Sequence, residues 1–399
     1  MRLGYLVPQF PGQTHIFFWR EIRELRRRGV HVDLLSTRPP PRGLIAHDWS
    51  DEAMAETTYL GRADPVAALA ALSRQDLREL VAATRAEGRP FLRDVALSLP
   101  AAQRLLRHAR ERRLDHVHVH SCGRAGLIAA LAREMGGPPF SLTLHGPLSD
   151  YGTGQPLKWR RAAFATVITD RLMDEVRRTI PVLPPRLEVQ PMGVDTDRLR
   201  RPAPYVPHDE SRPLRIFSCG RLNRVKGHQD LMQAVRLLRD GGRDATLAIA
   251  GEDDAGGTGY RATLEARIAE LGLGDAVTLL GAIDEGAVVR HLLEADVFVL
   301  ASWHEPLGVA LMEAMSCAVP TIGTDAGGVG ELIVDGRDGL LVPPKSPDAL
   351  ATAIARVADD PALAARLSAG GRARVETAFH SGRGAETLIR LIEETRRAG

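Results

Sequence analysis

A chain of 399 residues with 44% hydrophobic and 26% charged residues has an ordinary globular balance, and its length favours two domains of roughly 200 residues each. The formal net charge of +2 excludes the strong positive field that nucleic-acid binding would need, so no nucleic-acid partner is expected. No apolar run approaches the roughly 18 residues of a membrane-spanning helix. The cysteines lack metal-ligand spacing, which indicates reduced thiols in a cytoplasmic protein; they are Cys122, Cys219 and Cys317.

Strands and helices are predicted to alternate through the first half of the chain. Such alternation favours an α/β fold of parallel sheets with right-handed crossovers. Residues 51–100 are rich in Ala and Arg and predict helix without a functional signal. The expected strands are 3–7, 30–36, 117–120, 140–144 and 166–168, and the expected helices include 16–28 and 125–135.

The alternation stops at residues 197–213, where prolines among polar residues predict a linker. It then resumes, and a last helix at about 384–397 is expected to cross back to the first domain. The predicted strands of the second half are 214–218, 246–250, 277–280, 297–300, 321–323 and 339–342. The predicted divisions are 1–196, the linker 197–213, 214–380 and a C-terminal helical segment 381–399.

Two glutamates with seven residues between them, Glu305 and Glu313, follow the apolar strand 297–300. Glu305 is expected on the turn that leaves the strand, and Glu313 about a turn and a half into the next helix. Ligands of open α/β sheets bind at this edge, and the amides of Gly308 and Val309 at the helix start suit an anion. One carboxylate could then accept hydrogen bonds from a sugar while the other holds a ribose diol. The alternative is a pair of solvated surface acids.

Basic residues lie at the corresponding edge of the first strand of the second half. Gly220 ends that strand, where a missing Cβ would let the backbone approach a ligand. Arg221 and Lys226 project from the next loop, and a guanidinium with an ammonium group suits a diphosphate, although surface charge alone would also explain them. Further on, the loop from Gly281 through Ile283 could offer main-chain contacts to a flat base, or be a plain tight turn.

Histidines gather near strand ends of the first half. Strand alternation places His118 and His120 on one face, and a hydrogen-bonded core histidine is expected for His118. His145 ends a later strand, and His15 lies in the first loop, so both are expected to face a ligand. The spacing is not specific for a metal, and no metal site is predicted.

Arginines cluster at residues 20–28 and 104–113. Two solvated helix faces are the expected explanation. The alternative is a surface that approaches anionic lipid headgroups on the inner face of the membrane, supported by Phe17, Phe18 and Trp19 just upstream.

Taken together, these motifs resemble the retaining glycosyltransferases of family 4, which have the GT-B fold of two doubly wound Rossmann-like domains facing a central cleft. The resemblance extends over nearly the whole chain and is most specific in the second half. It rests on 220–222 with Lys226, the Glu pair, and the segments 192–195, 314–321, 327–332 and 336–342.

The resemblance implies that Glu313 binds the donor ribose and Glu305 the hydroxyls of the transferred sugar. It implies that Arg221 and Lys226 neutralise the diphosphate, and that His145 lies near the transferred sugar. The implied catalytic residues are Glu305, His145, Arg221 and Lys226. The implied donor-binding residues are Gly220, Arg221, Lys226, Ile283, Glu305, Leu307, Gly308, Val309 and Glu313.

It further implies a nucleotide-sugar donor, with a UDP-sugar favoured by family frequency, no cofactor or metal, and retention of the anomeric configuration. The first domain would bind the acceptor and the second the donor. The first loop departs from a related branch that carries Ser-Glu-Thr-Phe, because His15 replaces the Glu. The assigned acceptor-side residues are Gly12, Thr14, His15 and His120.

The acceptor, the sugar, the linkage and the oligomeric state stay open, with polysaccharide, glycolipid and natural-product biosynthesis as candidates. A glycosidase also uses two carboxylates but explains neither Arg221 nor Lys226. A nucleotide-sugar 2-epimerase shares the architecture, as would a silent sugar-nucleotide-binding protein. The intact charged residues speak against the silent alternative.

Overall fold

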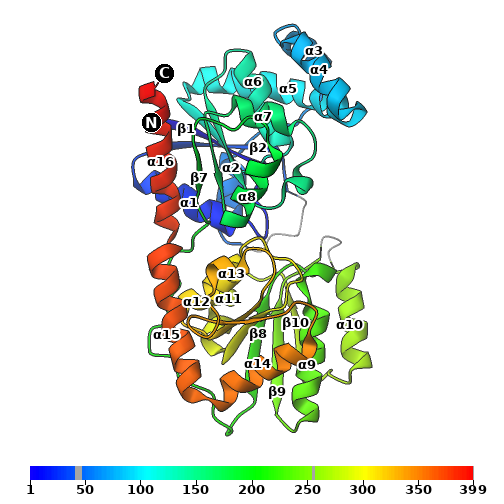
Figure 1. Cartoon of the computed structure of the whole chain (residues 1–399), viewed down its shortest axis with the longest axis vertical. Helices are drawn as coiled ribbons and strands as arrows, with labels where there is room; N and C mark the ends of the chain where they lie inside the picture. The colour runs from blue at the N-terminus through cyan, green and yellow to red at the C-terminus, as the bar shows by residue number, and fades with distance from the viewer. Residues whose placement is uncertain (41–46, 254–256, 399) are drawn as a thin grey trace. The chain divides into compact units, whose positions relative to one another are not determined.

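The computed structural model describes residues 1–40, 47–253 and 257–398, and the chain divides into two compact units. Unit 1 contains residues 1–40, 49–191 and 384–398, and unit 2 contains residues 47–48, 192–253 and 257–383. Each unit is a parallel sheet with helices packed on it (Figure 1). The α/β class and the two Rossmann-like sheets predicted from the sequence are therefore confirmed.

Unit 1 is built on a seven-stranded parallel sheet in the order β3-β2-β1-β4-β5-β6-β7. In register, Tyr5 of β1 pairs with His118 of β4, and His118 pairs with Ser141 of β5. The two edge strands β3 and β7 have two and three residues, too short for a periodic signal in the sequence. The strands are β1 (Arg2–Gln9), β2 (His31–Arg38), β3 (Thr58–Tyr59), β4 (His116–Val119), β5 (Phe140–Leu144), β6 (Phe164–Val167) and β7 (Leu187–Val189).

Residues 50–112 of unit 1 are mostly helical, as the Ala- and Arg-rich composition predicts, with the short strand β3 between the first and second of four helices. Asp64 and Asp76 cap two of them, each with a carboxylate that accepts backbone amides of the first turn. The helices of unit 1 are α1 (Ile16–Arg27), α2 (Ser50–Glu56), α3 (Pro65–Leu72), α4 (Leu77–Glu87), α5 (Arg89–Arg112), α6 (Arg124–Glu134), α7 (Gln155–Arg161), α8 (Asp170–Thr179) and α16 (Ser381–Ala398).

The C-terminal helix α16 completes the core of unit 1. Its buried side chains Leu388 and Ile392 join a cluster that contains Phe18 and Trp19 of α1. Charged pairs fix its outer face, with 2.8 Å between Arg28 Nη2 and Glu386 Oε1. The return of α16 to the first domain agrees with the sequence expectation.

The same cluster corrects the lipid-facing role considered for the start of α1. Phe18 and Trp19 are each only 5% exposed, and Arg20 is 4% exposed. Their apolar surface is already covered by the core of unit 1, so these side chains are not available to a membrane.

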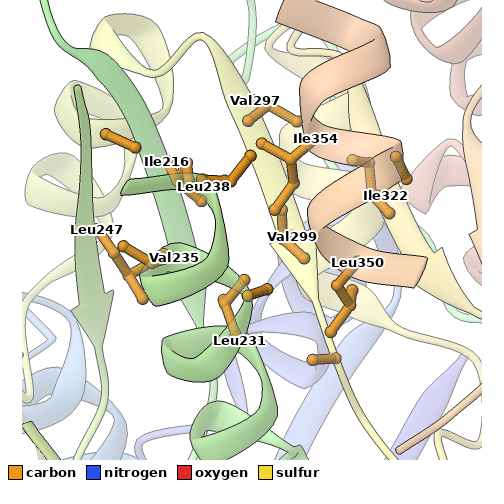
Figure 2. Close-up of a cluster of buried hydrophobic side chains, with 14 of the residues drawn as sticks. Ile216, Leu231, Val235, Leu238, Leu247, Val297, Val299, Ile322, Leu350 and Ile354 are labelled. Carbon is orange, nitrogen blue, oxygen red and sulfur yellow. The ribbon is translucent and has the colours of Figure 1, made fainter. Parts of the chain in front are cut away.

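Unit 2 has a six-stranded parallel sheet in the order β10-β9-β8-β11-β12-β13. Figure 2 shows the core between this sheet and helices α9 and α14, where Leu231 and Val235 of α9 and Ile354 of α14 face strand residues such as Val297 and Val299. The strands are β8 (Leu214–Cys219), β9 (Ala245–Ala250), β10 (Val277–Gly281), β11 (Val297–Leu300), β12 (Thr321–Thr324) and β13 (Leu340–Val342). The helices are α9 (His228–Asp240), α10 (Tyr260–Glu270), α11 (Glu285–Glu294), α12 (Val309–Ser316), α13 (Val329–Leu332), α14 (Pro347–Asp359) and α15 (Pro361–Ala378).

The proline-rich stretch 197–213 packs on unit 2 through specific polar contacts. The Tyr205 hydroxyl donates to Asp296 O over 2.7 Å, and the Arg212 guanidinium makes a two-point contact of 2.6 and 2.5 Å with the Asp296 carboxylate. Arg201 donates to Leu293 O over 2.8 Å. A buried carboxylate paired in this way holds the stretch against the strand that precedes the Glu305 loop.

Candidate functional site

Loops at the carboxyl ends of β8 and β11 are pressed together in unit 2. Gly227 adopts φ +68°, and a Cβ there would lie 1.9 Å from Ala301 O, so only glycine allows this approach. Beside it, Trp303 N donates to Val225 O over 2.7 Å. This packing brings the short 3-10 turn Arg224–Lys226 against the loop that carries Glu305.

Glu305 and Lys226 form a direct ion pair at this junction. The distance from Lys226 Nζ to Glu305 Oε2 is 2.5 Å, and the Ser302 hydroxyl donates to the same oxygen over 3.0 Å. Glu305 is 8% exposed and Ser302 is fully buried. The sequence placed both charged residues at one edge of the sheet but did not show that they pair, nor that Ser302 supports the carboxylate.

The backbone of the Glu305 turn is also fixed. Glu305 O accepts from Gly328 N over 2.9 Å, and Gly327, with φ +74°, has no room for a Cβ because it would lie 2.0 Å from that same oxygen. Gly327 and Gly328, which lead into α13, therefore brace the Glu305 turn. Gly308 follows with φ +99° and leads into α12 without a side-chain cap.

Glu313 lies on α12 and is 9% exposed, so it is a buried acid and not a surface acid. Burial, followed by the charge of Glu313, raises the pKa of the neighbouring Cys219 thiol to about 12. Cys219 is therefore an uncharged, unreactive group beside the carboxylate at neutral pH. Glu305 and Glu313 are both enclosed residues at the edge where ligands of such sheets bind.

The other residues that the sequence assigned to a donor differ in exposure. Leu307 is 1% exposed, whereas Val309, the first residue of α12, is partly exposed. Arg221 is exposed, and none of the described residues forms an ion pair with its guanidinium. Ile283 follows β10, an edge strand of the sheet. A Cβ on Gly220 would meet only ordinary contacts, the nearest 3.8 Å away at Lys226 Cδ, so the fold itself does not require glycine there.

A second cluster lies in unit 1 at the carboxyl ends of β4 and β5. His120 follows β4, His145 follows β5, and 3.1 Å separates His120 Nδ1 from His145 Nε2. The ring of Phe18 lies 4.8 Å from that of His120, 5.4 Å from that of His145 and 5.3 Å from that of His15, between centroids. The structure thus brings the three predicted histidines around one phenyl ring.

The first loop places its residues at the edge of this cluster. His15 N donates to Gly12 O over 2.9 Å, and the His15 ring covers Gly12 so closely that a Cβ there would lie 2.5 Å from Nδ1. Thr14 is exposed. His118, by contrast, is 2% exposed, and its ring nitrogens bond Ser141 Oγ at 2.7 Å and Thr143 Oγ1 at 2.9 Å. The expectation of a core histidine at 118 is confirmed.

Two residues of this cluster were missed from the sequence. The Tyr5 hydroxyl donates to Glu21 Oε2 over 2.6 Å, and the same oxygen lies 2.9 Å from His120 Nε2. We call Tyr5, Glu21, His120 and His145 the Glu21 network. Its members come from β1, α1 and the ends of β4 and β5, and no spacing in the sequence links them.

Burial governs the protonation of the Glu21 network. It lowers the pKa of His120 to about 3 and is also the largest cause that lowers the pKa of His145 to about 3, followed by the nearby His120. Burial and the Glu21 carboxylate raise the pKa of Tyr5 well above its usual value. Both histidines and the tyrosine are therefore neutral near pH 7.

Within residues 1–40, 47–253 and 257–398, no group of three or more His, Cys, Asp or Glu side chains is arranged to hold a metal ion. The helices of those same residues include none with both the length and the apolar character needed to cross a bilayer.

Two family models match the chain: Glycosyltransferase Family 4 over residues 16–198 and Glycosyl transferases group 1 over residues 207–374. The alpha-D-kanosaminyltransferase of Streptomyces kanamyceticus is 30% identical over 275 residues, which cover 63% of this chain and 70% of the relative. The putative teichuronic acid biosynthesis glycosyltransferase TuaC of Bacillus subtilis is 28% identical over 95% of this chain and 93% of its own.

Among solved structures, Anabaena Alr3699/HepE in complex with UDP and glucose superposes with a TM-score of 0.75. The superposition covers 98% of this chain and 99% of that protein, at 18% identity. At this identity the likeness shows a shared GT-B fold.

Proposed function

Because the chain belongs to the family 4 glycosyltransferases, we propose that it transfers a sugar from a nucleoside-diphosphate sugar to an acceptor hydroxyl, with retention of the anomeric configuration and without a bound metal. A UDP-sugar is the favoured donor, and the UDP held by the structurally similar Anabaena protein supports this choice. The observation that carries the proposal is the enclosed Glu305–Lys226 pair with Glu313 on the adjoining helix.

The side chains of unit 2 suit the departure of a diphosphate. Arg221 and Lys226 supply positive charge for the diphosphate oxygens, and the amides of Gly308 and Val309 at the start of α12 supply neutral donors. As the sugar–phosphate bond breaks, negative charge grows on the leaving phosphate, and fixed positive groups stabilise it more than they stabilise the ground state. They take the role that a divalent cation has in other enzymes.

The two glutamates have separate roles in this proposal. Glu305 accepts hydrogen bonds from the hydroxyls of the transferred sugar, and Ser302 keeps its carboxylate in place by donating over 3.0 Å. Glu313 accepts from the ribose diol. Leu307 and Gly220 would shape the floor, and the main chain at Ile283 would contact the base.

Unit 1 would bind the acceptor, with Gly12, Thr14, His15 and His120 on that side and His145 beside the transferred sugar. The leaving phosphate would take the proton of the acceptor hydroxyl on the same face of the sugar. The relatives include a kanosaminyltransferase and a putative teichuronic acid biosynthesis glycosyltransferase, so both small-molecule and polymer acceptors stay open. We place the protein in the cytoplasm, peripherally attached to the inner face of the membrane.

The test is incubation of the purified protein with individual nucleotide sugars and candidate acceptors, followed by chromatography of the released nucleotide and NMR of the product. Acceptor-dependent release of a nucleoside diphosphate with a retained anomeric signal supports the proposal. Isomerised nucleotide sugar without transfer would indicate the 2-epimerase instead, and binding of nucleotide without turnover would indicate a silent binding protein.

A further inference from the structure

Helices α3 and α4 and the first turns of α5 carry an unusual number of exposed apolar side chains in unit 1. Figure 1 shows α3 and α4 protruding from the sheet layers of that unit. Of the ten exposed large hydrophobic side chains in the described part of the chain, six lie between residues 66 and 97. They are Val66, Leu69, Leu77, Val81, Leu92 and Leu97.

Helix α3 is apolar on every side, yet only Ala67 and Ala71 are buried in it. A helix that is hydrophobic all round is normally enclosed on all sides. Here Val66 is 80% exposed and Leu69 is 69% exposed, and the two lie one turn apart on one face. The apolar composition of α3 predicts that its outward face is covered. Among the described residues, however, no apolar partner covers that face.

Arginines border these apolar residues. Arg78 and Arg85 share the outer face of α4 with Leu77 and Val81, at helical spacing. All four arginines of the surface are exposed, and none of the described residues forms an ion pair with any of them. The four are Arg78 and Arg85 of α4 and Arg89 and Arg93 of α5.

Most acids of the same segment are used within unit 1. Asp64 and Asp76 cap α3 and α4, and Glu79 pairs with Arg161. Glu87 accepts from Gly154 N over 2.6 Å, and Asp94 accepts from the Thr153 hydroxyl over 2.7 Å. What remains toward solvent is a mixture of apolar side chains and unpaired guanidinium groups.

We propose that this α3–α5 surface, the six apolar residues with the four arginines, docks on an anionic lipid membrane. Apolar side chains would enter the headgroup boundary while the guanidinium groups bind lipid phosphates. A second copy of this chain fits this surface less well, because a two-fold interface would bring the arginines of the two copies close together. The proposal deepens the peripheral attachment proposed above and moves it away from α1, where Phe18 and Trp19 are buried.

The test is sedimentation of the full chain with vesicles of phosphatidylcholine alone and of phosphatidylcholine mixed with phosphatidylglycerol. An arginine variant carries Arg78→Gln, Arg85→Gln, Arg89→Gln and Arg93→Gln, and an apolar variant carries serine at Val66, Leu69, Leu77 and Val81. The matched controls are Arg177→Gln with Arg178→Gln on α8, and Val206→Ser with Val334→Ser in unit 2, all at exposed positions.

We expect binding to the anionic vesicles, at least about tenfold weaker in each α3–α5 variant, because each basic residue near the surface contributes about fivefold and burial of the apolar side chains also contributes. The controls should bind as the unchanged protein does. Equal binding to neutral vesicles, or unchanged binding by the arginine variant, would overturn the proposal. So would a dimer in light scattering that the apolar variant abolishes. The assay needs no nucleotide sugar. Membrane docking can therefore be refuted while transfer activity is observed, and transfer can be refuted while docking is observed.

The Glu21 network supports a second inference from separate observations. The Glu21 Oε2 atom lies 2.9 Å from His120 Nε2, although not in line for a hydrogen bond, and a carboxylate oxygen this close favours an N–H over a lone pair at that nitrogen. A neutral imidazole has one N–H, so His120 Nδ1 accepts and His145 Nε2 donates across 3.1 Å. These protons are assigned from the network. His145 Nδ1 is then a lone pair, buried and without a hydrogen-bond partner among the described residues.

We infer that Glu21 is a positioning residue that fixes His145 as the Nε2–H tautomer and so presents Nδ1 as an acceptor for a sugar hydroxyl. The role of Nδ1 rests on the proposed function, whereas the tautomer does not. A buried acceptor that lacks a partner is costly to maintain, and a hydroxyl donor on the ligand would satisfy it. The opposite tautomer would present an N–H and would require an acceptor on the ligand.

The test is long-range nitrogen–proton NMR of the histidine rings at neutral pH, assigned with His145→Asn, for the unchanged protein, Glu21→Met and Tyr5→Phe. We expect the Nε2–H tautomer of His145 in the unchanged protein and in Tyr5→Phe, and a tautomer mixture in Glu21→Met with kcat lowered about tenfold. An Nδ1–H tautomer in the unchanged protein, or an unaltered tautomer in Glu21→Met, would refute the inference. If the tautomers behave as expected but no nucleotide sugar is turned over, the proposed function fails and the assigned tautomer stands.

Discussion

Unit 2 carries its candidate functional groups as enclosed charges on neighbouring loops, whereas unit 1 assembles neutral histidines from elements far apart in the sequence. The Lys226–Glu305 pair joins two loops that follow adjacent strands, with 2.5 Å between the charged atoms. In unit 1, Glu21 lies on α1 and contacts His120 after β4, and burial keeps the histidines uncharged. Charge would stabilise a diphosphate, and neutral imidazoles would orient hydroxyls. Under the proposed function, the donor and acceptor sides would therefore use different chemistry, and the following experiments test this contrast.

Acid should destabilise unit 1 more than unit 2. The folded-state pKa is about 3 for His116, His120 and His145, and about 4 for His228 in unit 2. Below about pH 6.5 the unfolded chain binds more protons than the folded chain. The contribution of these neutral histidines to the free energy of unfolding is therefore complete above about pH 6.5 and is lost as the pH falls toward their folded-state pKa values. At pH 5 each such group costs roughly 2 kcal/mol.

Hydrogen exchange followed by mass spectrometry at pH 7 and pH 5, corrected for intrinsic rates, measures both units in one sample. Protection should fall first in β4 and β5 of unit 1. A His116→Asn variant removes one titrating group and should flatten the pH dependence. Loss of protection in unit 2 at a higher pH than in unit 1 would contradict the contrast between the units.

Glu305→Gln should have the largest effect on transfer. The amide keeps the shape of the side chain but removes the charge that holds Lys226 and accepts from sugar hydroxyls, at a cost of roughly 1.5–3 kcal/mol, or about ten- to a hundredfold. Initial rates should fall by that factor while calorimetric nucleotide binding is largely kept. Glu265→Gln on the exposed face of α10 is the matched control. Full activity in Glu305→Gln would remove the assigned role.

Lys226→Met should weaken nucleoside-diphosphate binding by about tenfold or more, because the ammonium group is partly enclosed. Arg221→Met should have a smaller effect, since an exposed charge is screened by water and salt. Isothermal titration of both variants at low and high salt separates the two contributions. Unchanged affinity in both would rule out the diphosphate assignment.

Ser302→Ala should have the smallest effect. The Ser302 hydroxyl contributes one hydrogen bond to Glu305, worth about 1 kcal/mol, so transfer should fall severalfold with nucleotide affinity unchanged. Comparison of kcat with the nucleotide dissociation constant tests this. A loss of affinity equal to the loss of rate would show that Ser302 acts on the whole pocket and not through the Glu305 carboxylate.

Much of unit 2 could be predicted because its candidate site residues lie close together in the sequence, within short segments. The strand 297–300 was predicted with the bounds that the structure gives β11, and the Glu305 turn and α12 follow directly. What the sequence could not show is pairing across loops, such as Lys226 with Glu305. It also did not show that the packing of these loops requires glycine at Gly227, where a Cβ would lie 1.9 Å from Ala301 O.

In unit 1 the strands bearing His120 and His145 were predicted, but their partners were not. Glu21 looks like any helix acid, and only the fold brings it to His120. The aromatic residues of α1 looked suited to lipid but are core, because α16 returns from the far end of the chain to cover them. Contacts between residues so far apart in the sequence produce no local periodicity that could be detected. The exposed face of α3 was missed for the opposite reason, since its composition indicates burial.

The most direct test of the central claim, that unit 2 binds a nucleoside diphosphate, is thermal unfolding of the full chain against uridine, guanosine, adenosine and deoxythymidine diphosphates without added metal. A ligand at about a hundred times its dissociation constant stabilises the folded state by roughly 2.7 kcal/mol. The account predicts a clear rise in Tm with one of these nucleotides, with uridine diphosphate favoured, and a smaller rise in Lys226→Met. No rise with any of the four would contradict it.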